Sequence, residues 1–156
     1  MSVDVQVRYR KRRVDPARVR ALALHVLAAE GRADAGLSVV VVNDRRIAAL
    51  HREFLDVPGP TDVISFPLDD DPLPGEAPLL GEVVVSADTA AREARARGLP
   101  FERELLLYVA HGTLHLLGYD DHAPRDRARM HRRQEALLAR FLSGSRRRGR
   151  GAASRV

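Results

Sequence analysis

Two histidines four residues apart are the feature of this sequence best suited to chemistry. His111 and His115 lie in the stretch AHGTLHLLGYDDH, inside a largely apolar segment that predicts a buried helix. A spacing of four places both imidazoles on the same face of that helix, and two ligands of a tetrahedral zinc ion need this arrangement. We therefore predict a metal site at these histidines.

The third ligand is expected beyond the helix, after a turn. Gly118 supplies a residue that turns the chain readily, and Asp120, Asp121 and His122 follow it. Each of these three residues carries a side chain of a type that binds zinc. The residue types alone leave open which of the three does so.

The residue next to the first histidine argues against a peptidase. Zinc proteases with an HExxH helix place a glutamate there, and it acts as the general base. This chain has Gly112 at that position, so the base is missing from the helix. The missing side chain also predicts open space beside the metal for a bulky substrate.

Composition restricts both the ligands and the class of protein. The chain has 156 residues, 45% of them hydrophobic, which is typical of one domain with its own core. It contains no cysteine, which excludes a disulfide partner and a thiolate metal site. No apolar run is long enough to cross a bilayer and no signal-peptide pattern begins the chain, so we expect a cytoplasmic protein without membrane contact.

Basic residues are concentrated near both ends of the chain. Residues 143–156 hold five arginines and no acid; removing these five from the 26 basic residues leaves 21, equal to the number of acidic residues. We predict a folded domain over residues 1–142 and a disordered arginine-rich tail over 143–156. Basic clusters of this kind favour polyanions. The arginines expected to contact such a partner are Arg10, Arg12, Arg13, Arg146, Arg147 and Arg148.

Hydrophobic periodicity predicts the elements that position these residues. Alternating or β-branched stretches predict strands at residues 3–9, 37–43, 62–66 and 81–88, and helical spacing predicts helices at 16–30, 45–54, 89–98, 101–118 and 124–142. Asp15, the pair Asn43-Asp44 and Asp88 are expected to cap three of the helices. This order predicts a single α+β domain, a small mixed β-sheet packed with about five helices, with the zinc site at the end of a central helix.

Several motifs together resemble the YbeY family, also known as the UPF0054 family of rRNA maturation factors. HGTLHLLGYDDH at residues 111–122 is similar to the family signature HGxLHLxGYDH. Further similar stretches are PTDVISFPL at 60–68, LGEVVVSADTA at 80–90 and FERELLLYVAHG at 101–112, and the similarity spans about residues 39–141. Members of the family are single-domain, zinc-dependent endoribonucleases that act in small-subunit rRNA 3′-end maturation and in ribosome quality control.

The resemblance implies an endoribonuclease specific for single-stranded RNA that binds one Zn²⁺ per chain. It also implies small-subunit rRNA and the ribosomal small subunit as partners, with the basic clusters contributing affinity for RNA phosphates. Two alternatives remain at this point. One is a ribosome-assembly factor with a structural or weakly catalytic metal site, and the other is a metal-dependent hydrolase of another substrate.

The family register favours Asp121 as the third metal ligand, with His122 as the alternative. Family members have a histidine six residues after the second ligand, and this chain has Asp121 there. They also have a methionine nine residues beyond that histidine and a glutamine four residues further, and Met130 and Gln134 lie at those distances from Asp121. In this interpretation His111 and His115 take part in catalysis through the metal.

Three further residues are candidates to support the site or to bind substrate. Many family members carry an arginine six residues before the threonine of PTDV, where this chain has Leu55, so a nearby cation such as Arg52 or Arg45 would have to bind the phosphate. The alternative is that Leu55 packs under its loop. Asp62 is a candidate to orient a ligand or water, although its position favours a cap at the start of a strand. Ser65 is a candidate to hydrogen-bond RNA or the backbone.

Overall fold

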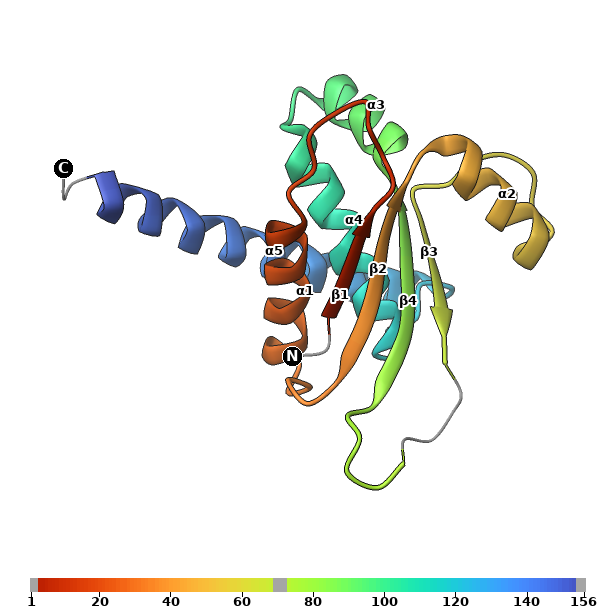
Figure 1. The fold of residues 1–156 in the computed structure, drawn as a ribbon, viewed down its shortest axis with the longest axis horizontal. Helices are drawn as coiled ribbons and strands as arrows, with labels where there is room; N and C mark the ends of the chain where they lie inside the picture. Colours follow the sequence, from red (N-terminus) through yellow and green to blue (C-terminus); the bar gives the residue numbers. More distant parts are fainter. Residues whose placement is uncertain (1–2, 69–72, 154–156) are drawn as a thin grey trace.

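The computed structural model describes residues 3–68 and 73–153, with the backbone alone from residue 145 onward. Its elements follow the predicted order, and the chain forms a single α+β domain (Figure 1). The elements are β1 (Val3–Val7), α1 (Pro16–Ala29), β2 (Gly36–Val42), α2 (Asp44–Leu55), β3 (Val63–Pro67), β4 (Leu79–Ser86), α3 (Ala87–Arg97), α4 (Phe101–Leu116) and α5 (Pro124–Ala153).

Within the described residues the strands form one mixed sheet in the order β1-β2-β4-β3. The strand β2 pairs in parallel with both β1 and β4, and β3 pairs antiparallel with β4 at the sheet edge. The valine run of β2 is buried on both faces, as expected for a central parallel strand. The sequence prediction of a small mixed sheet is therefore confirmed.

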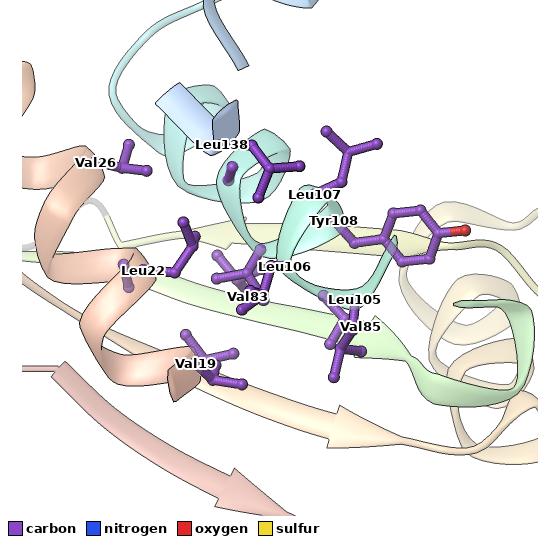
Figure 2. Close-up of a cluster of buried hydrophobic side chains, with 14 of the residues drawn as sticks. Val19, Leu22, Val26, Val83, Val85, Leu105, Leu106, Leu107, Tyr108 and Leu138 are labelled. Atoms are coloured by element: carbon purple, nitrogen blue, oxygen red, sulfur yellow. The ribbon is translucent and has the colours of Figure 1, made fainter. Parts of the chain in front are cut away.

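Helices cover both faces of this sheet. On one face α1, α4 and α5 bury a large aliphatic cluster, and α4 lies at its centre, packed against β3 and β4 (Figures 1 and 2). On the other face α2 buries only Ile47, against Val40, Val42, Ile64 and Val84. Because α4 is held by the sheet and by the three helices α1, α3 and α5, the histidines near its C-terminal end stand on a rigid support.

The predicted helix caps are correct at Asp15 and Asn43 but wrong at Asp88. The Asp15 carboxylate accepts a hydrogen bond from the Ala17 N–H, and the Asn43 side chain accepts one from the Arg46 N–H. Helix α3 begins two residues earlier than expected, so Ser86 caps it and Asp88 lies in its first turn. The strand β4 ends at Ser86 and α3 follows without a loop, which leaves Asp88 free to bind groups outside its own helix.

For the end of the chain the sequence predicted a disordered tail over residues 143–156, of which residues 154–156 lie outside the described residues. Helix α5 continues to Ala153, and Figure 1 shows its C-terminal part extending away from the rest of the domain. Among the described residues no helix has the length and apolarity to span a membrane.

Candidate active site at the end of α4

The predicted metal ligands surround one hollow of about 310 Å³ at the C-terminal end of α4. We call it the histidine hollow. Helix α4 contributes the two histidines, the following loop contributes an aspartate and a third histidine, and α2 and β3 form the opposite wall. Its lining residues are Leu55, Val63, Ile64, Ser65, His111, His115, Asp121 and His122.

His111 is held by a hydrogen bond on the side of its ring away from the loop. Its Nδ1 lies 2.8 Å from Oε1 of Gln134, a largely buried residue of α5. An amide oxygen only accepts, so Nδ1 is the donor, and in the neutral imidazole Nε2 is then the nitrogen that keeps a lone pair. Nε2 lies 3.8 Å from Oδ2 of Asp121. The imidazole therefore presents an unprotonated nitrogen on the side where the loop carboxylate stands.

The loop after α4 is turned back and fastened to α5. Gly118 has φ +104°, a backbone conformation that side-chain-bearing residues rarely adopt, and this turn brings the following residues back beside His111. Arg127, near the start of α5, donates from Nε to the Asp121 carbonyl oxygen at 3.1 Å and from Nη2 to the His122 carbonyl oxygen at 3.2 Å. These two bonds fix the backbone of the candidate third ligands.

Asp121 and His122 take different positions in this loop. The Asp121 side chain is 36% exposed and faces His111, whereas the His122 side chain is 88% exposed. Among the described residues, the group whose ligand atoms all lie within 4.8 Å of one another is Asp120, Asp121 and His122. This group does not include His111 or His115. Of its three members, Asp121 is the one with a carboxylate oxygen near a helix histidine, 3.8 Å from Nε2 of His111.

Gly112 does not open space for a substrate, contrary to the sequence expectation. It is buried against the sheet, where an added Cβ would lie 2.5 Å from Cγ1 of Val83 and 3.1 Å from Cγ2 of Val63. Its carbonyl oxygen accepts a hydrogen bond from the Ser65 hydroxyl at 3.1 Å. The missing side chain therefore lets α4 approach β3 and β4 closely, and Ser65 ties the strand to the helix beside the histidines.

The remaining candidates divide between the site and its surroundings. Leu55 is 53% exposed and lines the histidine hollow, so it does not pack under its loop. Asp62 accepts a hydrogen bond from the Val63 N–H, as the strand-cap alternative predicts, and it faces a neighbouring hollow. Arg52 is exposed on α2 and is absent from the described lining of the histidine hollow. Arg45 lies at the opposite end of α2 from Leu55, about 15 Å from it along the helix.

The predicted RNA-binding arginines are not gathered at the histidines. Arg10, Arg12 and Arg13 are exposed in the loop after β1, and the Arg12 guanidinium lies 5.5 Å from the Phe101 ring, at the N-terminal end of α4. Phe101 and His111 are separated by about 15 Å along the helix. The side chains of Arg146, Arg147 and Arg148 lie outside the described part of the chain.

The donor types that line the histidine hollow suit a zinc ion. Imidazole nitrogens and carboxylate oxygens are ligands that zinc accepts, and the hollow leaves open space beside them. The Gln134 contact adds the support that histidine ligands commonly receive on their second nitrogen.

Sequence reasoning missed two residues that hold this site. Gln134 served only to align the chain with the family, although its distance from Met130 already marked it as part of a pattern. Arg127 carries no signal in the sequence, because its role depends on how the loop folds back onto α5.

The chain is similar in sequence and in fold to known proteins. A sequence model of the family described as Endoribonuclease YbeY matches residues 4–142. The Endoribonuclease YbeY of Anaeromyxobacter sp. (strain Fw109-5) is 50% identical over 140 residues, covering 90% of this chain and 71% of that protein. The Endoribonuclease YbeY of Syntrophotalea carbinolica is 39% identical over 142 residues, covering 89% of this chain and 95% of that protein. The solution structure of TM1509 from Thermotoga maritima matches with a TM-score of 0.65 at 26% identity and covers 94% of this chain and 93% of that one.

Proposed function

This chain belongs to the YbeY endoribonuclease family and is an endoribonuclease, and we propose that it hydrolyses single-stranded RNA at one zinc ion bound by His111, His115 and Asp121. Membership of an endoribonuclease family argues against the alternative of a hydrolase for peptides or small molecules. The observation that carries the proposal is the pair formed by His111 and Asp121, in which Gln134 holds the proton on Nδ1 and Nε2 faces the carboxylate.

The histidine hollow supports catalysis over a purely structural metal. Structural zinc sites are closed by four protein ligands, whereas this site has three proposed ligands around an open space. A bound zinc ion would supply Lewis acidity for attack on a phosphodiester. The same observation weighs against the alternative of an assembly factor whose metal only stabilises the fold.

The chain's own residues then set the conditions of the reaction. Gln134 fixes the ring of His111, and Ser65 fixes the distance between β3 and α4. Asp121 adds a negative charge that a third imidazole would lack, and this charge would make a zinc-bound water less acidic. We therefore expect RNA cleavage to reach its maximum rate at a higher pH than at a centre of three neutral histidines. His122, with its side chain 88% exposed, lines the solvent side of the same hollow.

Replacement of His115 by alanine tests the proposed function. His115 is exposed and lines the hollow, so we expect a folded variant that cleaves RNA at least about 100-fold more slowly than the parent, since loss of even an outer partner of a metal ligand costs 10–100-fold. The parent should contain about one zinc per chain by elemental analysis. The control is His25→Ala, which removes a histidine that joins α1 to α5 outside the histidine hollow. An unchanged cleavage rate for His115→Ala would contradict the zinc mechanism.

We further propose that the substrate is the 3′ region of small-subunit rRNA, bound on the ribosomal small subunit in the cytoplasm. Family membership supports this assignment. The expected result is cleavage of 3′-extended precursor transcripts within the extension; uniform cleavage of unrelated single strands would contradict it.

The basic residues are proposed to add phosphate affinity that is independent of sequence. Deleting residues 143–156 removes five arginines, so RNA binding should weaken and depend less steeply on salt concentration. Equal salt dependence of the two proteins would show that the segment does not contact RNA.

A further inference from the structure

A second hollow of about 450 Å³ adjoins the histidine hollow at His111, which lines both. We call it the glutamate hollow. It is formed by α3, α4, α5 and the start of β3, and its volume lies in the usual range for small-ligand sites. Its charged and titratable lining residues are Asp62, Glu93, Arg97, Glu104, His131 and Glu135, in addition to His111.

Glu104 leaves one carboxylate oxygen without a hydrogen-bond partner. Its side chain is 1% exposed, and among the described residues Oε1 is the buried side-chain oxygen that lacks a partner. The nearest cations are Nη1 of Arg97 at 3.6 Å and Nη1 of Arg103 at 3.9 Å, both beyond hydrogen-bond length. A buried acceptor left unpaired is unfavourable, so this oxygen is suited to a ligand that brings a donor.

The charges of the glutamate hollow restrict that ligand. Four carboxylates face one guanidinium and two imidazoles, so a phosphate group would be repelled. A neutral ligand with N–H donors satisfies this restriction and supplies the donor that Glu104 lacks.

We propose that the glutamate hollow binds a base of the RNA strand beside the cleaved phosphodiester, with Glu104 accepting a hydrogen bond from an exocyclic amino group. Bases of single-stranded RNA are free to enter such sites, and acidic side chains accept from base amino groups. The inference rests on the proposed function, since it assumes that the cleaved bond lies at His111. Uracil has no amino group, and its single N–H is flanked by two carbonyl oxygens, so uracil should be disfavoured.

The arrangement along α4 matches this assignment. Glu104 and His111 are seven residues apart, two helical turns on one face, which corresponds to about 10 Å. Tyr108 lies between them and also lines the hollow, and Figure 2 shows its hydroxyl directed away from the aliphatic cluster. Burial, followed by the negative charges of Glu104 and Asp62 and a hydrogen bond with Glu104, raises the pKa of Tyr108 far above its usual value, so the hydroxyl stays protonated beside Glu104.

The test compares short single-stranded oligoribonucleotides in which each position near the cleaved bond is varied in turn through the four bases. Affinity is measured in the His115→Ala background and cleavage in the parent. At one position uracil should weaken binding about tenfold relative to adenine or cytosine. Glu104→Gln should remove that preference, because an amide donates to carbonyl oxygens as well as accepting from amino groups. Glu102→Gln, the same change on the same helix but outside the glutamate hollow, should retain it.

A substrate analogue keeps the inference testable if Glu104→Gln does not fold. Replacing adenosine by purine riboside at the sensitive position removes only the amino group and should cost the parent about tenfold in affinity. Equal affinity for all bases and for the analogue, with cleavage intact, would overturn the base site and leave the proposed function standing. A base preference in binding that depends on Glu104, found without any RNA cleavage, would support the base site and contradict the proposed function.

Discussion

Two clusters of polar side chains border the sheet, and they differ in how completely hydrogen bonds satisfy them. At the carboxyl ends of β2 and β4, the Asp44 carboxylate accepts from Ser86, Thr89 and Arg92, and the Asp88 carboxylate accepts from Tyr9, Lys11 and the Asp44 N–H. We call these residues the capping network. In the histidine hollow, by contrast, Nε2 of His111 and the Asp121 carboxylate stand 3.8 Å apart, and His115 is exposed. Polar groups that satisfy one another join elements of the fold, whereas groups left open toward a hollow are available to a ligand.

The electrostatics of the capping network support this distinction. Burial raises the pKa of Asp44, but hydrogen bonds from Arg92, Ser86 and Thr89 outweigh burial and leave the pKa below its usual value. The pKa of Asp88 is lowered in the same way, by the Asp44 N–H, Lys11 and Tyr9 acting against burial. Both aspartates are therefore stabilised as carboxylates in the folded state, and their expected contribution is to stability.

Replacing Asp44 should give the largest loss of stability. Asp44→Ala leaves the buried Ser86 hydroxyl and the Thr89 hydroxyl without their acceptor, and it removes the Arg92 ion pair. We expect the free energy of unfolding in urea to fall by about 3 kcal/mol, since each unsatisfied buried group costs about 1–3 kcal/mol. Asp34→Ala, which removes an exposed carboxylate, should change it by less than about 0.5 kcal/mol. Equal effects of the two substitutions would contradict a structural role for the network.

Asp121→Ala should give the opposite result, a loss of activity without a loss of stability. Removing a proposed metal ligand should slow RNA cleavage by at least about 100-fold, equivalent to about 2.7 kcal/mol. Because the side chain is partly exposed, the urea midpoint should stay close to that of the parent. His122→Ala should retain zinc and most of the activity. If His122→Ala loses zinc and Asp121→Ala keeps it, the third ligand is His122.

The sequence predicted the elements of the fold better than it predicted what joins them. Alternating strands, helical spacing and the caps at Asp15 and Asn43 are local features, and they gave the element order correctly. The role of Asp88 was missed because its partners Tyr9 and Lys11 come from a distant loop. The role of Gly112 was misjudged for a similar reason, since the face of α4 that meets β3 and β4 is known only once the sheet is placed.

The candidate site shows the same limit. The spacing of His111 and His115 was enough to place both at one hollow, because helix periodicity is a local property. The hydrogen bond from His111 to Gln134 joins residues 23 positions apart on two helices, and no local pattern predicts it. The open oxygen of Glu104 was likewise invisible, since an unpaired group is defined by the absence of neighbours in the folded chain.

Gln134 combines features of the two clusters. It is buried and hydrogen-bonded, as in the capping network, and it also orients a proposed metal ligand of the histidine hollow. Gln134→Ala should weaken zinc binding by about 10–100-fold in competition with a chelator, since His111 loses the acceptor that fixes its tautomer. Gln134→Glu keeps an acceptor at this position and should restore much of the affinity. If both variants bind zinc as the parent does, His111 needs no support from α5.

Lowering the pH should give the smallest change of the four experiments. It tests the structural role of the capping network through the free energy of unfolding, without any measurement of activity. The pKa of Asp88 in the folded state lies below its usual value of 3.8, so its contribution is fully present above that value and is lost as pH falls through the folded-state pKa. The free energy of unfolding, measured in urea from about pH 5 to about pH 2, should therefore fall less steeply for Asp88→Asn than for the parent. Asp34→Asn, the exposed control, should follow the parent curve. Parallel curves for the parent and Asp88→Asn would show that Asp88 does not couple folding to protonation, and the contrast between the two clusters would then rest on geometry alone.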